Sequence, residues 1–201
     1  MSSKPITLYG FSYGDRSGRV RWLFEELGIA YEDHMLSWDL MEHRSPEYLK
    51  INPMGTVPTV RFDGRSLCET GAICLTFVDL HPQKGLAPQP GSPLRAEYYQ
   101  WMFFATSTLE PLMEKLWRAR EAKDHAAEAQ ASEEFKAAAL LLESALSGKT
   151  YLVGNEFSAA DIMIGSLLNW GDFLIKLSPV FKIYFEKLKA RPACRKSRIF
   201  T

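Results

Sequence analysis

The sequence predicts an α/β domain of order βαβαββα, followed by a domain built only from helices. Strand-like and helix-like patterns alternate up to residue 81. Asp63-Gly64 lies between Thr59-Val60-Arg61-Phe62 and Arg65-Ser66-Leu67, which is a strong signal for a two-residue hairpin. Only helical periodicity follows the stretch from His81 to Pro93, which is rich in proline and glycine. We therefore expect a first domain at residues 1–81, a linker at 82–91 and a helical domain at 92–201.

Each element of the first domain has a local signal. Trp22, Leu23 and Leu27 recur at the spacing of a buried helix face, and Gly28 ends that helix. The expected elements, in order, are a strand from Ile6 to Phe11, a helix from Val20 to Leu27, a strand from Ile29 to Leu36, a helix from Leu40 to Lys50, two hairpin strands flanking Asp63-Gly64, and a helix from Glu69 to Leu80.

The second domain is expected to be all-helical. Its predicted helices run from Leu94 to Arg120, from Ala122 to Leu146, from Ser158 to Lys176 and from Val180 to Ala190. Ser158 and Asp161 have the spacing of a capping box, in which Asp161 reaches back to the amide of Ser158, and Phe157 and Ile162 stand at staple positions. The run from Lys187 to Arg198 is locally basic, and we expect a solvated tail there, with an anion contact as the alternative.

Composition excludes several classes of function. Lysine plus arginine equals aspartate plus glutamate at 24 each, which argues against a nucleic-acid partner. No apolar run has membrane-spanning length, and the N-terminus has no signal-peptide core, so we expect a cytoplasmic protein with no membrane partner. The cysteines, Cys68, Cys74 and Cys194, form no Cys-x-x-Cys pair, so we expect neither a disulfide framework nor a dithiol or metal site.

The segment from Asn52 to Val60 predicts a binding site in combination with Glu69-Thr70. The first segment is a turn, a proline bond and the start of a strand, and the second opens a helix with an acid and a hydroxyl. A proline before an edge strand and a helix N-terminus together present free backbone groups and a positive dipole end. That combination suits a small peptide-like anion.

This arrangement resembles the glutathione-binding half of the cytosolic glutathione transferases, and the resemblance covers nearly the whole chain. It implies a thioredoxin-like first domain, an all-α second domain, and glutathione as co-substrate. It also implies a homodimer that conjugates the glutathione thiolate to hydrophobic electrophiles, with reduction of organic hydroperoxides as a further activity. Chi-like, zeta-like and delta-like members have the nearest patterns.

The resemblance implies a role for each glutathione-contacting residue. Glu69 and Thr70 would hold the γ-glutamyl end, for which an ordinary helix cap is the alternative. Val57 would pair its backbone with the cysteinyl unit, and Pro58 would be cis. His43 would contact the glycine carboxylate.

Three further readings concern the glycine end. Arg44 is a competing cation for the same carboxylate, and a solvated surface side chain is the alternative for His43. Thr56 stands where many relatives have lysine or glutamine, which makes it a weaker candidate.

The residue that activates the thiol is the hardest to assign. The loop from Gly10 to Trp22 places Gly14, Asp15 and Arg16 where family members of different classes have a catalytic serine or cysteine. The chi class has an arginine at the position of Arg16, so Arg16 is the first choice, with Ser17 as a hydroxyl donor. Ser12 and Tyr13 are candidates if the loop shifts, and a solvated or Asp15-paired Arg16 is the alternative.

An electrophile pocket is expected between the domains, although most of its candidate residues would be core. The candidates are Trp101, Met102, Phe104, Ala105, Thr106, Trp117, Trp170 and Phe173. A glutathione-dependent isomerase of the maleylacetoacetate type is an alternative activity. A non-catalytic glutathione-binding or interaction module is another, and Gly14-Asp15 favours it because an acid beside a forming thiolate opposes it.

Overall fold

The computed structural model describes residues 5–12, 14–171 and 178–200. The chain forms two compact units, one of Met1–Lys84 with Arg191–Thr201, and one of Gly85–Ala190. The expected helical domain at 92–201 therefore differs from the second unit at its C-terminal end. The cause is tertiary packing, because the segment after residue 190 pairs with a helix of the first unit.

A mixed sheet forms the centre of the first unit. Its strands are β1 (Ile6–Gly10), β2 (Tyr31–Met35), β3 (Thr59–Phe62) and β4 (Arg65–Cys68), in the order β2-β1-β3-β4. β1 is parallel to β2 and antiparallel to β3, and β3 is antiparallel to β4. Asp63 and Gly64 have φ of 48° and 76°, as a type I′ turn requires, which confirms the predicted hairpin.

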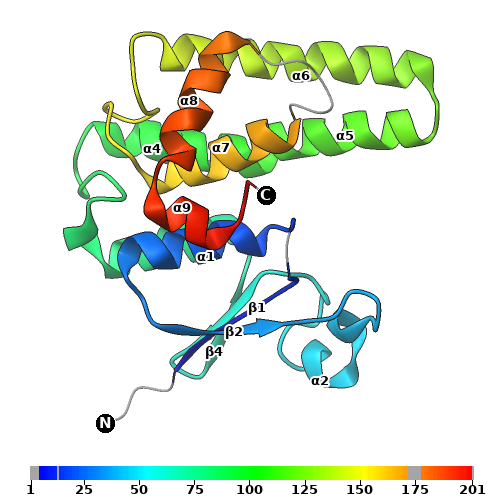
Figure 1. The fold of residues 1–201 in the computed structure, drawn as a ribbon, viewed down its shortest axis with the longest axis vertical. Helices are drawn as coiled ribbons and strands as arrows, with labels where there is room; N and C mark the ends of the chain where they lie inside the picture. Colours follow the sequence, from blue (N-terminus) through cyan, green and yellow to red (C-terminus); the bar gives the residue numbers. More distant parts are fainter. Residues whose placement is uncertain (1–4, 13, 172–177, 201) are drawn as a thin grey trace. The chain divides into compact units, whose positions relative to one another are not determined.

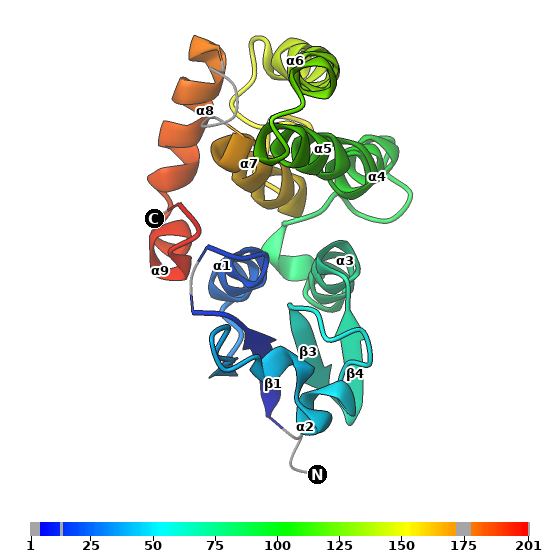
Figure 2. The same cartoon turned by 90° about the vertical axis from the view of Figure 1, so that its right-hand side faces the viewer.

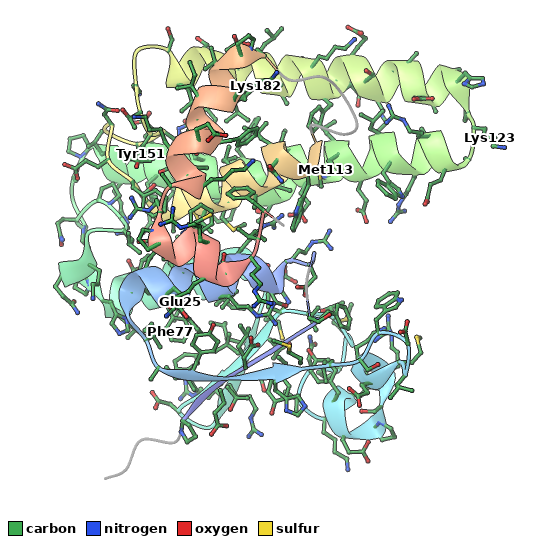
Figure 3. The ribbon with its side chains drawn as sticks, in the orientation of Figure 1. Glu25, Phe77, Met113, Lys123, Tyr151 and Lys182 are labelled. Carbon is green, nitrogen blue, oxygen red and sulfur yellow. The ribbon has the colours of Figure 1, made fainter. Side chains whose placement is uncertain are left out.

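Helices cover both faces of this sheet. α1 (Ser17–Leu27) and α3 (Thr70–Leu80) lie on one face, and α2 (Pro46–Leu49) lies on the other (Figure 2). The ring centroids of Phe24 and Phe77 lie 4.7 Å apart in the core between α1, α3 and the sheet. Figure 3 labels Phe77 in this core. The observed order βαβαββα matches the expected one.

The helix expected from Leu40 to Lys50 is divided. A 3₁₀ turn, η1 (Glu42–Arg44), is followed by Ser45 in extended backbone and then by α2. The residue before a proline is pushed out of the α region, and Ser45 precedes Pro46. The Ser45 hydroxyl accepts from the amide of Tyr48 at 3.2 Å, so it caps the second helix. A further 3₁₀ turn, η2 (Pro82–Lys84), lies in the expected linker.

The described part of the second unit is helical. Its elements are α4 (Leu94–Phe104), the π-helical turn η3 (Ala105–Leu109), α5 (Glu110–Glu121), α6 (His125–Leu146), α7 (Ala159–Gly171) and α8 (Pro179–Lys189) (Figure 1). The helix expected from Leu94 to Arg120 thus contains a π turn. The predicted end of the third helix, up to Lys176, lies outside the described residues.

Asp161 is a buried junction of the second unit. Its Oδ2 accepts from the Ser158 amide at 2.9 Å and from the Ser158 hydroxyl at 3.1 Å, which confirms the expected return to Ser158. Its Oδ1 accepts from the Leu152 amide at 3.0 Å and from the Tyr184 hydroxyl at 2.9 Å. Burial raises the pKa of Asp161 to about 6, although these donors oppose the shift. The carboxyl group joins α7 to α8 and to the loop before α7.

The basic segment at the C-terminus is not a solvated tail, so that expectation is wrong. It contains a short helix, α9 (Pro192–Ser197), that contacts α1. Cys194 and Ile199 are each 2% exposed. Arg191 pairs with the carboxylate of Glu26 and Lys196 with that of Glu25, so the charges of these two side chains are used within the fold.

Candidate functional site

The turn before β3 contains a cis Val57-Pro58 peptide bond, as expected. Two buried side chains brace it. Tyr48 Oη donates to the Thr56 carbonyl at 2.6 Å, and Asn52 Nδ2 donates to the same carbonyl at 2.8 Å. Asn52 Nδ2 also donates to the Thr56 hydroxyl at 3.2 Å. The exposed Thr56 side chain is therefore held by the turn.

Glu69 has an unusual backbone for a residue of its type. It is the N-cap of α3, its φ is 67° and its ψ is 112°, and its side chain is exposed. A non-glycine residue with positive φ is strained, and such strain is found preferentially at binding sites. Its side chain makes no capping hydrogen bond within the described chain. Glu69 therefore presents its carboxylate to solvent at the positive end of a helix, and the ordinary-cap reading does not describe it.

Strand register brings this residue to the cis-proline turn. Thr59 pairs with Cys68 across β3 and β4. The next residues outward, Pro58 and Glu69, therefore leave the sheet side by side. Thr70, the first residue of α3, is 7% exposed beside them. The turn, the acid and the helix N-terminus form one compact constellation.

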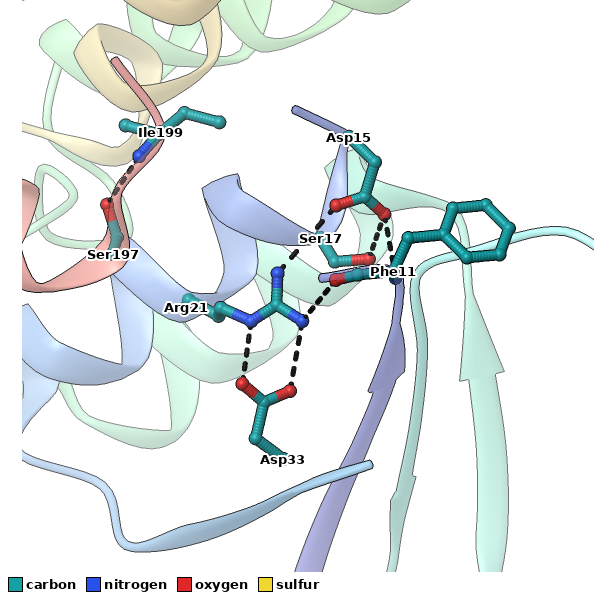
Figure 4. Close-up of polar contacts among 7 residues, drawn as sticks. All are labelled: Phe11, Asp15, Ser17, Arg21, Asp33, Ser197 and Ile199. Carbon is teal, nitrogen blue, oxygen red and sulfur yellow. Dashed lines mark hydrogen bonds and ion pairs between the residues drawn. The ribbon is translucent and has the colours of Figure 1, made fainter. Parts of the chain in front are cut away.

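The loop between β1 and α1 is organised around Asp15 (Figure 4). Asp15 Oδ2 accepts from the Ser17 hydroxyl at 2.6 Å and from the Phe11 amide at 3.3 Å, and Oδ1 lies 3.7 Å from Arg21 Nη1. Ser17 is fully buried, and its proton is used on Asp15. Arg16 is the exposed N-cap of α1. Arg16 and Ser17 are the two residues expected to contact the thiol, and of these Arg16 is exposed whereas Ser17 is buried.

His43 is 4% exposed, which differs from the alternative of a solvated histidine. Its ring stacks on Trp38 with centroids 4.9 Å apart and an interplanar angle of 2°, and it meets Phe11 edge-on at 5.3 Å. His43 Nδ1 is buried without a hydrogen-bond partner in the described part of the chain. The competing cation, Arg44, donates to the Met54 carbonyl at 3.1 Å.

Sequence reasoning missed Trp38, which is 61% exposed although it is a large aromatic residue. The signal was a lone tryptophan in the polar stretch Ser37-Trp38-Asp39. It also missed Arg21, whose charge neutralises the Asp15 region. Of the alternative loop residues, Ser12 is exposed, and Tyr13 lies outside the described residues.

The electrophile-pocket candidates lie on the second unit. Trp101, Met102 and Ala105 are buried, as expected for core residues, and Trp117 is exposed. Phe104, Thr106 and Trp170 are half-buried, and Phe173 lies outside the described residues.

Residues 5–12, 14–171 and 178–200 contain neither a metal-ligand cluster nor a membrane-spanning helix. In these ranges, histidine, cysteine, aspartate and glutamate side chains form no group of three that could hold a metal ion. Over the same ranges, every helix is too short or too polar to cross a lipid bilayer.

Comparison with known proteins agrees with the fold. Residues 8–85 match the family described as glutathione S-transferase, N-terminal domain, and residues 100–192 match its C-terminal domain. Glutathione S-transferase GstB of Escherichia coli K12 is 30% identical over 203 residues, covering 95% of this chain and 96% of that protein. Glutathione S-transferase A of Pleuronectes platessa is 27% identical over 207 residues, covering 97% of this chain and 92% of that protein.

Two solved structures share the fold of this chain. Glutathione transferase URE2P6 from Phanerochaete chrysosporium, in complex with oxidized glutathione, has a TM-score of 0.84 at 28% identity, covering 96% of this chain and 94% of that one. Ure2p in complex with glutathione has a TM-score of 0.87 at 24% identity, covering 96% of this chain and 98% of that one, which shows the shared fold. The expected thioredoxin-like domain with an all-α partner is confirmed. The chain belongs to the glutathione S-transferase family, whose co-substrate is glutathione.

Proposed function

We propose that this protein is a glutathione S-transferase that binds glutathione on its first unit and transfers the glutathione thiolate to hydrophobic electrophiles. One observation carries the proposal. Strained Glu69, at the positive end of α3, lies beside the cis Val57-Pro58 turn. An exposed acid, a helix N-terminus and a turn that can offer its backbone are the groups that an extended γ-glutamyl peptide requires. The turn leads into β3, which lies between β1 and β4 and is therefore not the edge strand expected from the sequence.

Each part of glutathione has a partner in this arrangement. The Glu69 carboxylate binds the γ-glutamyl ammonium, and the Thr70 hydroxyl with the first amides of α3 binds the α-carboxylate. The Val57 backbone pairs with the cysteinyl unit as an added strand. The glycine carboxylate lies toward His43 and Thr56. Support for the His43 role comes from its buried Nδ1, whose desolvation a carboxylate contact would offset.

Thiol activation is assigned to Arg16 and the N-terminus of α1. A thiol with an ordinary pKa of about 8.5 must fall by roughly two units to ionise at neutral pH, which is about 2.7 kcal/mol. A guanidinium and a helix N-terminus can supply this. Ser17 acts one step back, because its hydroxyl holds Asp15 inward. Arg21 beside Asp15 reduces the repulsion that this acid would exert on a thiolate.

A second candidate is a glutathione-binding module without catalysis. The specific observation is Asp15, a carboxylate one residue before the N-cap of α1, where negative charge disfavours a thiolate. This reading keeps the binding roles of Val57, Glu69 and Thr70 and removes the catalytic role of Arg16.

Three measurements on the full chain separate these possibilities. Calorimetry gives glutathione affinity, ultraviolet difference absorbance gives the thiolate fraction of the bound ligand, and an aryl-halide assay gives conjugation. Binding with thiolate formation and turnover supports the transferase, and binding without either supports the module. Absence of binding would exclude both. Light scattering on the same sample tests the proposed homodimer.

A further inference from the structure

The C-terminal segment, defined here as residues 191–200, is bound along α1. Arg191 Nε and Nη2 donate to Glu26 Oε1 and Oε2 at 2.6 and 2.8 Å, a bidentate pair. Lys196 Nζ donates to Glu25 Oε2 at 2.7 Å, and Figure 3 locates Glu25 on α1. These pairs hold the C-terminal half of α1, away from the loop that carries Arg16.

Ile199 contacts the opposite end of the same helix. Gly18 is the second residue of α1, and a Cβ placed on it would lie 2.5 Å from Ile199 Cδ1. All three heavy atoms nearest to that Cβ position belong to the Ile199 side chain. Ile199 is 2% exposed. The glycine therefore allows the isoleucine to lie directly against the first turn of α1.

The position of Ile199 is itself constrained. Its amide donates to Ser197 Oγ at 3.4 Å (Figure 4). Ser197 Oγ in turn donates to the Cys194 carbonyl at 2.6 Å. The ring of the following residue, Phe200, packs edge-on against Trp22 of α1 at 5.6 Å. Contacts on both sides of Ile199 thus fix the side chain against Gly18.

The first turn of α1 links this contact to the proposed thiol site. The Gly18 amide donates to the Asp15 carbonyl at 3.2 Å, and the Arg19 amide donates to the Arg16 carbonyl at 3.2 Å. Asp15, Arg16 and Gly18 therefore belong to one hydrogen-bonded turn. A shift of Gly18 displaces the Arg16 backbone and the free amides of the helix N-terminus, whose electrostatic effect falls off within one turn.

We propose that Ile199 is a positioning residue for thiol activation, which holds the first turn of α1 at the distance where Arg16 and the helix N-terminus stabilise the thiolate. This inference rests on the proposed function. Other contacts keep α1 folded without Ile199. Arg21 binds Asp33, Glu26 binds Arg191, and the ring of Phe24 lies in the core. Loss of Ile199 therefore acts on the first turn more than on the helix as a whole.

The test compares Ile199→Ala with wild type by the thiolate fraction of bound glutathione, by affinity, and by amide exchange at Gly18 and Arg19. We expect the pKa of the bound thiol to rise by about half a unit from about 6.5, so that the thiolate fraction at pH 7 falls from about three quarters to about one half, with affinity within about twofold of wild type. Exchange at the two amides should accelerate. Ile183→Ala is the matched control, because Ile183 is 66% exposed on α8 of the second unit.

A size exchange makes the test specific to this contact. Gly18→Ala should lower the thiolate fraction, because the new methyl group meets Ile199 Cδ1. Ile199→Val removes that carbon, so the double variant Gly18→Ala/Ile199→Val should recover most of the lost thiolate. Such non-additivity is the signature of direct contact.

The outcomes separate the two proposals. A wild-type thiolate that persists unchanged in Ile199→Ala, or a double variant without recovery, overturns the positioning role alone. A thiolate loss matched by an equal loss of affinity also overturns it, because that pattern reports general damage. A wild-type complex with no thiolate overturns the proposed transferase activity and this role together.

Discussion

The guanidinium of Arg21 binds both carboxylate oxygens of Asp33, with Nε at 2.8 Å and Nη2 at 3.0 Å (Figure 4). The same Nη2 donates to the Phe11 carbonyl at 2.8 Å, and Nη1 lies 3.7 Å from Asp15 Oδ1. One side chain on α1 therefore joins β2, the end of β1 and the loop that contains Arg16. This network gives the proposed thiol site a rigid base.

Replacement of Arg21 by leucine should destabilise the protein. It leaves Asp33 and Asp15 without their cation, and the loss of one partner of a buried pair costs about 3–5 kcal/mol. Because Asp33 is 24% exposed, we expect a value near the lower end, about 3 kcal/mol, in urea unfolding. Arg118→Leu is the control, since its pair with Glu114 is exposed and should cost under about 0.5 kcal/mol. Similar costs for both variants would contradict the network.

Replacement of Glu69 should separate stability from binding. Glu69→Gly removes a strained backbone and should raise the free energy of unfolding by about 1 kcal/mol. The same change removes the carboxylate, a charge-assisted contact of about 1.5–3 kcal/mol, so glutathione affinity should fall roughly ten- to a hundred-fold. Glu69→Gln should lose affinity without the gain in stability. Unchanged affinity by calorimetry in both variants would remove Glu69 from the site.

His43 should act on one end of the ligand. His43→Ala should weaken glutathione more than γ-glutamylcysteine, which lacks the glycine carboxylate. Arg44→Ala is compared with the same two ligands, because Arg44 is the competing cation for the glycine carboxylate, although it donates to the Met54 carbonyl. Trp38, stacked on His43, should report binding by its fluorescence. Equal losses for the two ligands would assign His43 a packing role only.

Arg16 should change the thiol more than the affinity. Arg16→Ala should raise the pKa of bound glutathione, seen as a loss of thiolate absorbance at neutral pH, with affinity mostly intact. Arg16→Lys should restore part of the effect, since lysine keeps the charge without the planar fork. If Arg16→Ala keeps the wild-type thiol pKa and Ser17→Ala raises it, the role passes to Ser17.

Asp161 should make stability fall as pH rises between about 4 and 6. Burial raises its pKa in the folded state to about 6 from an ordinary value of 3.8, so over this window the folded state holds a proton that the unfolded state has released. The contribution of the group is full below pH 4 and is lost by about pH 6, for a total of about 3 kcal/mol. The difference in the free energy of unfolding between wild type and Asp161→Asn, measured across this pH range, isolates the contribution of Asp161. A constant difference between the two proteins would refute it.

Local sequence signals determined the order of the elements and the arrangement of part of the candidate site. The hairpin at Asp63-Gly64 requires positive φ at both positions, and the capping contact of Asp161 spans three residues, so each depends on neighbours in the chain. The constellation of Val57, Pro58 and Glu69 was predictable for the same reason, because a hairpin register carries it. The break at Ser45-Pro46 was also locally encoded, although the apolar periodicity around it masked the signal.

Only the tertiary structure decided which distant groups meet. The sequence identified Asp15 and a basic C-terminal run, but the folded chain determined that Arg21 lies beside Asp15 and that Arg191 binds Glu26. It also determined that Ile199 packs on Gly18. Charge and hydrophobicity specify that a side chain needs a partner, and many partners satisfy that need equally. The path of the backbone in space makes the choice, which is why a segment expected to be solvated is instead bound to the helix that carries the proposed thiol site.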